Sequence, residues 1–245
     1  MRILRWVKKA ILLSENASLD VDLRYMPVVR FLREMASTAT ILEVGSGYVG
    51  ITPYINRTVV GVDAEFPAEP MPNMLPVISK GVLPFRDRAF DVVISLDTLE
   101  HVPRGFRQLF WNELIRTARR YVIVGFPEGE EAEEHDRLME QFYVRQHGSA
   151  QQYFVEHRTH RIPRGEEVSA YLRGASNDTR REFTVRQTKN VNIRIRALFM
   201  RLIWHHKRSF QRLYFALTAF SRWDTLFHFG SCYRSVYFLS MKQPE

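Results

Sequence analysis

A glycine-rich turn directly after a short apolar run constrains this chain more than any other feature. The stretch ILEVGSGYVG covers residues 41–50, and Gly45, Gly47 and Gly50 form the spacing G-x-G-x-x-G. Gly45 permits a tight turn and Gly47 lets the backbone approach a ligand, because glycine lacks a Cβ. The pattern predicts a cofactor-binding loop that opens a helix, whose N-terminus would favour a polar or anionic group. The glycines alone do not identify the cofactor.

Strands and helices are expected to alternate through the first half of the chain. Apolar, β-branched runs predict strands at 39–45, 58–63, 90–97 and 121–127, and apolar residues at helical spacing predict helices at 20–36 and 104–120. The proline-rich stretch 67–76 is expected to be a loop. This alternation predicts the α/β class, with a Rossmann-like, doubly wound, mostly parallel sheet and helices on both faces.

The second half is less regular and is expected to end in a separated strand. Beyond Pro127 an acidic run leads into a mixed segment, followed by a short helix at 163–175, a strand at 179–188, a helical stretch at 192–220 and a last strand at 233–241. About forty-five residues separate the last two strands, which is long for a hairpin. We divide the chain into N-terminal helices (1–36), a Rossmann-like domain (37–189), a helical insertion or cap (190–232) and the last strand with a tail (233–245).

Length and cysteine content set the broad class. The chain has 245 residues, enough for one sizeable α/β domain. Its only cysteine, Cys232, excludes an intrachain disulfide and a cysteine-built zinc site, which suits a cytoplasmic location. The stretch 1–16 interleaves basic and apolar residues without a small-residue cleavage site, so we interpret it as an amphipathic helix and not as a signal peptide.

An acidic residue follows the glycine loop at the distance that ribose recognition requires. Asp63 ends the second predicted strand, about twenty residues after the loop begins. A carboxylate there is placed to accept hydrogen bonds from ribose hydroxyls. A nicotinamide dinucleotide and S-adenosylmethionine both carry such a ribose, so Asp63 leaves both open.

A second block of residues resembles one family of cofactor enzymes. The stretch VLPFRDRAFDVVISLDTLEHVP, residues 82–103, together with ILEVGSG, resembles the class I S-adenosylmethionine-dependent methyltransferases over roughly residues 38–127. The resemblance implies S-adenosyl-L-methionine as the cofactor. The residues that it implies for cofactor binding are Glu43, Gly45, Ser46 and Gly47 at the methionine moiety, Asp63 at the ribose, Ser79 at the adenine, and Asp97 at the crevice.

The chain departs from the family pattern at two positions. Relatives commonly carry a glycine two places after Gly47, where this chain has Val49 and the glycine falls one later, at Gly50. Relatives often carry an aspartate against the adenine amino group, where this chain has Ser79. A serine hydroxyl and nearby backbone can still form hydrogen bonds there.

The candidate catalytic residues are His101 and Asp97, near the end of the third predicted strand. His101 is the expected general base if the methyl acceptor is a hydroxyl, although in the resembling family this histidine is often structural. Asp97 is expected to face the crevice where open α/β sheets bind ligands. No Asn/Asp-Pro-Pro-aromatic tetrapeptide follows the strand, which counts against amino groups of nucleic acids as acceptors. We expect transfer to oxygen of a small molecule, sugar or lipid-linked glycan.

Histidines elsewhere do not predict a metal centre. His157 and His160 lie three residues apart beside Glu156, a spacing that metal sites use, but we interpret them as a polar turn or a substrate-facing helix end. His205 and His206 are adjacent, so on a helix they point in different directions. The expected metal content is therefore none.

The helical insertion is basic and apolar in alternation. Its cationic residues, Arg194, Arg196, Arg201, Lys207, Arg208 and Arg212, are expected to stay in contact with water, and the net charge of the chain is +8. Such a surface suits a peripheral contact with the anionic inner face of a membrane, and it also suits a plain solvated face. Two other functions stay open, a nicotinamide-dependent oxidoreductase and a basic RNA-binding module on a Rossmann-like scaffold, although nucleic acid is not an expected partner.

Overall fold

The structure is a computed structural model that describes residues 19–66, 68–218 and 224–242. The amphipathic helix expected at 1–16 lies outside the described residues, and so does the end of the tail at 243–245. Within the described residues, no helix is both long enough and apolar enough to cross a bilayer.

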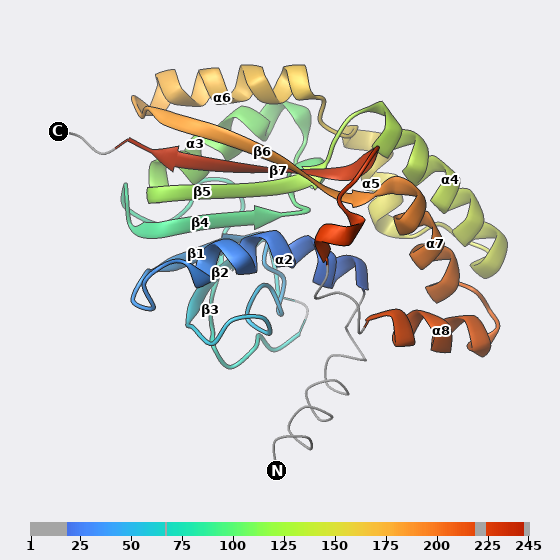
Figure 1. The fold of residues 1–245 in the computed structure, drawn as a ribbon. Coiled ribbons are helices and arrows are strands. Elements are labelled where there is room, and N and C mark those ends of the chain that lie inside the picture. The colour runs from blue at the N-terminus through green and yellow to red at the C-terminus, as the bar shows by residue number, and fades with distance from the viewer. Residues whose placement is uncertain (1–18, 67, 219–223, 243–245) are drawn as a thin grey trace, which may run out of the picture.

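Within the described residues, seven strands form one sheet in the order β3-β2-β1-β4-β5-β7-β6 (Figure 1). They are β1 (Ile41–Val44), β2 (Val59–Asp63), β3 (Met74–Ile78), β4 (Phe90–Leu96), β5 (Ala118–Pro127), β6 (Phe183–Asn192) and β7 (Cys232–Met241). The first five strands pair in parallel, whereas β7 runs antiparallel to both β5 and β6. The predicted doubly wound, mostly parallel sheet is confirmed.

The position of β7 distinguishes this sheet from the dinucleotide-binding Rossmann domain. That domain has the strand order 3-2-1-4-5-6. Here the last strand enters between β5 and β6 with the opposite direction, and two helices separate it from β6 in the chain.

Helices cover both faces of the sheet. On one face lies α2 (Leu19–Arg33), whose Val28 and Leu32 pack in a core with Val92 and Ile94 of β4. On the other face lie α3 (Arg107–Thr117) and α6 (Gly165–Thr179), which share a second core with Val93. Successive residues of β4 therefore face opposite cores, as the two-residue period of a strand requires.

Four further helices gather beyond the carboxyl ends of β4 and β5 (Figure 1). They are α4 (Glu130–His147), α5 (Gln152–His160), α7 (Ile193–Ile203) and α8 (Arg208–Thr218). Two short 3₁₀ helices, η1 (Leu99–His101) and η2 (Arg104–Phe106), connect β4 to α3. A separate apolar cluster joins Leu19 and Leu23 of α2 to Phe199 and Leu202 of α7 and Tyr214 of α8. The start of the described chain is thereby packed onto the insertion.

The loop expected at 67–76 is only partly a loop, because β3 begins at Met74. Pro76 lies inside this strand and pairs with Gly61. A proline cannot donate a backbone hydrogen bond, so it is confined in sheets to edge strands, and β3 is the outer strand of this sheet. Proline content alone was therefore a misleading signal here.

The helix expected directly after the glycine loop is also absent. Residues 45–58, all of them described, form turns and no helix. Gly50 has a left-handed backbone, with φ of 53°, which interrupts any helical path, and Pro53 removes a backbone N–H. The loop therefore lacks the helix N-terminus that was expected to favour an anionic group.

Regular structure was missed after Pro127. The acidic run and mixed segment form α4 and α5, and β6 continues to Asn192, beyond the expected end of the strand at 188. Four glutamates stand near the start of α4, where the positive end of the helix dipole favours them, and this N-terminal signal identifies the helix in retrospect. The division of the chain into four regions stays a prediction, although residues 190–192, which it assigns to the insertion, belong to β6.

Trp111 of α3 anchors the core beneath the sheet, fully buried and edge-on to Phe126 of β5 at 6.5 Å between ring centroids. We expect Trp111→Ala to lower the free energy of unfolding by about 3–5 kcal/mol, because the cavity cannot fully close. Chemical denaturation followed by fluorescence or circular dichroism measures this. Phe106→Ala is the matched control, because that ring is 62% exposed and its loss should cost less than about 0.5 kcal/mol. Equal losses in both variants would contradict the placement of the core.

Candidate functional site

The glycine loop leaves β1 in a tight turn that only glycine accommodates. Gly45 and Gly47 have left-handed φ values of 74° and 54°. The N–H of Gly45 donates to the carbonyl of Val62 at 2.8 Å, which fixes the loop against the end of β2. A Cβ on Gly45 would overlap the side chain of Thr98, whereas a Cβ on Gly47 would meet nothing within 4 Å. The open space above Gly47 is the place where a ligand can contact backbone directly.

Glu43 explains why the third glycine stands at position 50. Its buried carboxylate accepts hydrogen bonds from the N–H of Ile51 and from the hydroxyl of Tyr25, both at 2.8 Å. Glu43 thus ties the far end of the loop back to β1 and to α2. A Cβ on Gly50 would overlap this carboxylate, so the close approach requires glycine there. The residue acts on the loop from below and is itself only 1% exposed.

Burial perturbs the titration of Glu43. Desolvation raises its pKa to about 7, although the hydrogen bonds from Ile51 and Tyr25 act in the opposite direction. The carboxyl group therefore changes charge near neutral pH while it holds the loop.

Asp63 and Ser79 lie side by side at the carboxyl ends of β2 and β3. One oxygen of Asp63 accepts from the N–H of Gly47 and the other from the N–H of Ala64, each at 2.7 Å. The N–H of Ser79 donates to the carbonyl of Asp63 at 2.9 Å. A carboxylate offers about four lone-pair positions, so Asp63 keeps acceptor capacity for hydroxyl groups. The side chain of Ser79 is half-buried and donates to the carbonyl of Val82.

Asp97 is held in a buried charge network. Its backbone is left-handed, with φ of 49°, a strained conformation for a residue other than glycine. Arg234 of β7 binds both of its oxygens, with Nε distances of 2.7 and 2.9 Å, and Arg24 of α2 lies at 3.2 Å. Arg234 also binds Asp20 of α2 at 2.6 Å. One buried guanidinium therefore connects the end of β4 to the helix on the sheet face.

This network does not favour a proton-accepting role for Asp97. Burial alone would raise its pKa, but the guanidiniums of Arg234 and Arg24 outweigh that effect and hold the pKa below its ordinary value. Both oxygens are already occupied. The arrangement indicates that Asp97 orients the strand end, and its catalytic and cofactor-binding roles stay predictions.

The expectation that the insertion arginines contact water fails for Arg196. Its side chain is 4% exposed and pairs with Asp20 at 3.0 Å and with Asp136 of α4 at 3.6 Å. Its guanidinium also lies 3.5 Å from the ring centroid of Tyr233. The pairing with two buried carboxylates is the reason for this burial. Arg194, Arg201, Lys207, Arg208 and Arg212 are exposed.

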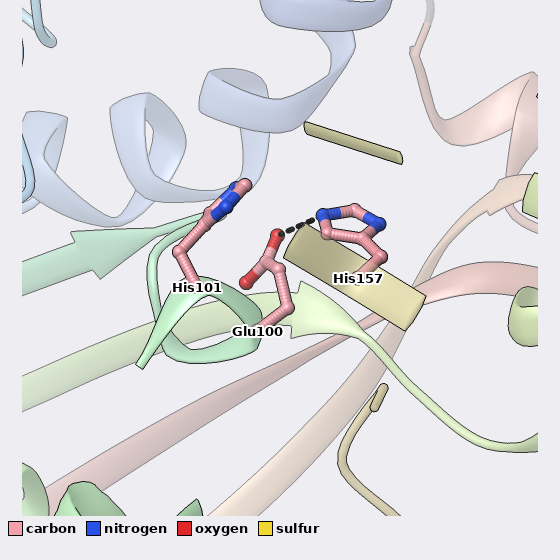
Figure 2. Close-up of side chains that lie close together, drawn as sticks. All are labelled: Glu100, His101 and His157. Carbon is pink, nitrogen blue, oxygen red and sulfur yellow. Dashed lines mark ion pairs between the residues drawn. The ribbon is translucent and has the colours of Figure 1, made fainter. Parts of the chain in front are cut away.

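His101 lies beside Glu156 and His157 of α5. It follows Glu100 in η1, and its ring centroid lies 4.9 Å from that of His157 of α5 (Figure 2). Nδ1 of His101 lies 2.6 Å from Oε2 of Glu156. Burial and the neighbouring His157 lower the pKa of His101, against the opposing effect of Glu156. Burial, reinforced by Asp97, raises the pKa of Glu100 well above its ordinary value.

The remaining histidine pairs do not form a site together. His157 points into the cluster with Glu100 and His101, and its spacing partner His160 has no ligand atom in that cluster. His205 and His206 stack on each other beyond the end of α7, and His206 binds Gln146. The three-residue spacing between His157 and His160 therefore does not identify the side chains that lie next to His157.

A cavity of about 490 Å³ lies behind this cluster and not above the glycine loop. It is lined by α4, α5 and the following segment, including Asp136, Phe154, His157 and Ile162. None of its lining residues belongs to the loop or to the ends of β2 and β3. His157 and Asp136 line this cavity, whereas Glu100 and His101 do not.

Solved structures share this arrangement of strands and helices. A methyltransferase dependent on S-adenosylmethionine from Thermotoga maritima is similar with a TM-score of 0.53 and 16% identity, over 97% of this chain and 100% of that chain. Phosphoethanolamine N-methyltransferase 2 of Haemonchus contortus, solved with S-adenosyl-L-methionine, is similar with a TM-score of 0.55 and 14% identity, over 90% of this chain and 52% of that chain. Profiles of known sequence families give no match, and curated protein sequences give none either. The chain has the class I methyltransferase fold.

The titration of Glu43 predicts a pH dependence of stability. A carboxyl group whose pKa is raised from 4.5 to about 7 on folding stabilises the protein below pH 4.5, and this contribution is lost as pH rises through about 7. Glu43→Gln removes the ionisation but keeps an oxygen that can accept from Ile51. We expect the stability of the variant relative to the parent to grow by up to about 3 kcal/mol between pH 5 and pH 8. Urea denaturation of both proteins across this range measures it. A constant difference would contradict the raised pKa.

Proposed function

We propose that this protein is a methyltransferase that uses S-adenosyl-L-methionine. The observation that carries this proposal is a glycine loop at the end of β1 with an acid at the end of β2, in a sheet whose last strand is antiparallel. The similar Haemonchus contortus structure, which contains S-adenosyl-L-methionine, supports the choice of cofactor.

The residues of the loop fit this cofactor. The open space above Gly47 can take the methionine moiety next to the backbone, with Gly45 and Ser46 below it and Glu43 bracing the turn. Asp63 retains acceptor capacity for ribose hydroxyls, and Ser79 stands beside it for the adenine. When bound, the cofactor supplies a methyl group activated by a sulfonium.

The loop is less suited to a nicotinamide dinucleotide. In dinucleotide-binding domains the pyrophosphate sits at the N-terminus of the helix that follows the glycines. Residues 45–58 of this chain contain no helix, so that stabilisation of two phosphate charges is missing. The antiparallel β7 also departs from the dinucleotide-binding strand order. The comparisons with solved structures support neither the oxidoreductase nor the RNA-binding alternative.

We infer that the acceptor is a small molecule, sugar or lipid-linked glycan, methylated at oxygen. His101 is the candidate general base. Because Glu156 is a carboxylate, it accepts from Nδ1–H of His101 and leaves Nε2 with a lone pair that can take a hydroxyl proton. Glu156 also orients the imidazole. The rest of the rate enhancement comes from holding the acceptor in line and excluding water.

Asp63→Ala tests the position of the cofactor. We expect it to weaken binding of S-adenosylhomocysteine by about 1.5–3 kcal/mol, because charge-assisted hydrogen bonds to the ribose are lost. Isothermal titration calorimetry measures the affinity. Glu34→Ala is the matched control, since it removes the same charge from an exposed position away from the loop and should leave the affinity unchanged. Unchanged affinity in Asp63→Ala with an intact fold would show that the ribose lies elsewhere.

We also infer peripheral contact with an anionic membrane through the insertion. Arg201, Arg208 and Arg212 are exposed there, next to apolar side chains that are also exposed: Leu198 at 52% and Leu213 at 50%. Exposed basic and apolar residues on the same helices are typical of segments that lie in the membrane interface.

Replacing Arg201, Arg208 and Arg212 together by Gln should weaken flotation with phosphatidylserine vesicles more than tenfold, at about 1 kcal/mol for each charge. The affinity for S-adenosylhomocysteine should stay within about twofold, because the charges lie far from the loop in sequence and on other elements. A control triple with the same loss of charge consists of three exposed residues: Arg173 of α6, Arg180 directly after α6, and Arg186 of β6. Equal flotation of both triple variants would assign the effect to net charge alone.

A further inference from the structure

Three side chains with metal-binding atoms converge beyond the carboxyl end of β4. One ligand atom each from Glu100, His101 and His157 lies within 4.8 Å of the others. Figure 2 shows the carboxylate of Glu100 between the two imidazole rings, one on η1 and the other on α5. The side chains of Glu100 and His157 are 1% and 7% exposed, whereas that of His101 is 31% exposed. The cluster is therefore closed on one side and open to solvent at His101.

When Glu100 is ionised, the atoms that face each other in this cluster are both acceptors. Nδ1 of His157 lies 2.7 Å from Oδ2 of Asp136, and because the carboxylate accepts, this nitrogen carries the proton. Nε2 of His157 is then an acceptor, and it lies 4.0 Å from Oε1 of Glu100, too far for a hydrogen bond. Nε2 of His157 and Oε2 of Glu100 are buried without a hydrogen-bond partner. An electron-pair acceptor between these atoms would satisfy both.

Both histidines also have the outer partner that metal ligands commonly have. A ligating imidazole usually donates its second ring N–H to a carboxylate or carbonyl, which fixes the ring and the tautomer. Asp136 is the carboxylate that accepts from Nδ1 of His157. Glu156 is the one that accepts from Nδ1 of His101, at 2.6 Å. Asp136 is itself fixed, since it accepts from the hydroxyl of Tyr233 at 2.9 Å. In both rings Nε2 is left as the nitrogen without a proton.

The two elements that carry the histidines are tied together by one buried arginine. Arg107 of α3 donates from Nε to the carbonyl of Val102, directly after η1, and from Nη2 to the carbonyl of His160 at the end of α5, both at 3.0 Å. The cluster is thus held by backbone contacts on both sides. Such preorganisation is a requirement for a tight metal site.

Glu100 forms no ion pair with an arginine among the described residues. The guanidiniums of Arg24, Arg196 and Arg234, at 20% side-chain exposure or less, pair instead with the carboxylates of Asp20, Asp97 and Asp136. The side chain of Glu100 is 1% exposed, and Nε2 of His157 lies 4.0 Å from its Oε1. A cation bound there would offset the cost of burying the ionised carboxylate.

We propose that Glu100, His101 and His157 bind a divalent transition-metal ion of the Zn²⁺ or Co²⁺ type. Two imidazoles and one carboxylate form a ligand set that such ions prefer, with coordination positions left open for water or substrate. Ligands that share a tetrahedral ion lie roughly 3.4 Å apart, so the side chains close in by about an ångström on binding. The sequence did not indicate this set, because His157 belongs to α5, far along the chain from Glu100 and His101 in η1.

Titration of the full chain with metal alone tests the proposal. After treatment with a chelator and dialysis, we expect the protein to bind one equivalent of Zn²⁺ in calorimetry, and Co²⁺ to give visible d–d absorption with the same stoichiometry. Mg²⁺ prefers oxygen ligands and should produce no comparable signal. His157→Ala and Glu100→Gln should each weaken Zn²⁺ binding at least tenfold, and circular dichroism checks that both are folded. Glu100→Gln keeps the side-chain shape if His157→Ala fails to fold.

His205→Ala combined with His206→Ala is the matched control, because it removes two imidazoles from a pair outside the cluster. We expect this variant to bind Zn²⁺ like the parent. Equal affinity of the parent and Glu100→Gln, or loss of binding in the His205/His206 variant alone, would overturn the proposal.

The metal site does not depend on the proposed methyltransferase function. With an ion bound, His101 would be a ligand through Nε2 and no longer a general base. Titration with S-adenosylhomocysteine in excess chelator reports on the cofactor loop alone, so failure of the metal proposal and failure of the cofactor proposal are separate results. Unchanged S-adenosylhomocysteine affinity in His157→Ala would support this independence.

Discussion

Ion pairs from Arg234 join β7 to α2 and to the end of β4 at the centre of the sheet. A guanidinium at 2% side-chain exposure needs carboxylates at its edges, and Asp97 from β4 and Asp20 from α2 supply them. This single requirement fixes the strained backbone after β4, the start of α2 and the register of the final strand. Because Asp20 also pairs with Arg196, the same charges draw α7 onto the sheet. The helices beyond the carboxyl ends of β4 and β5 are arranged around these contacts.

Two unlike environments therefore meet at the carboxyl edge of the sheet. Above β1 and β2 the glycine loop has open space at Gly47, and the buried carboxylate of Glu43 braces the loop. Above β4 and β5 it is made of charged and imidazole side chains from α2, α4, α5 and α7. The first environment suits a ligand recognised by shape and ribose hydroxyls, and the second suits chemistry that requires charge or coordination. The two environments therefore lie next to each other along the carboxyl edge of the sheet.

The sequence predicted that the glycine loop and Asp63 belong to one site, and they do lie in contact, whereas it did not predict the charge network, for a physical reason. The loop, Glu43 and Asp63 lie within about twenty residues, so their spacing carries the information. The charge network joins residues from opposite ends of the chain, and no local pattern indicates that Arg196 is buried while Arg201 is exposed. Pro76 misled because edge strands tolerate proline, and the turn after Gly47 misled because Gly50 prevents a helix. Contacts between elements that are far apart in the chain cannot be predicted from the spacing of residues in the sequence.

The placement of β7 has a consequence for how the protein acquires its structure. Strand β7 follows the other described strands in the chain and is nevertheless an interior strand, and Arg234 on it pairs with Asp20, 214 positions earlier. Until β7 is in place, β5 and β6 expose unpaired edges, and the carboxylates of Asp20 and Asp97 have no guanidinium from β7. Such long-range closure slows folding, because the loop entropy is lost before the contact forms. The sheet can therefore close only after β7 has been synthesised, because β5 and β6 both pair with β7 and, among the described strands, not with each other.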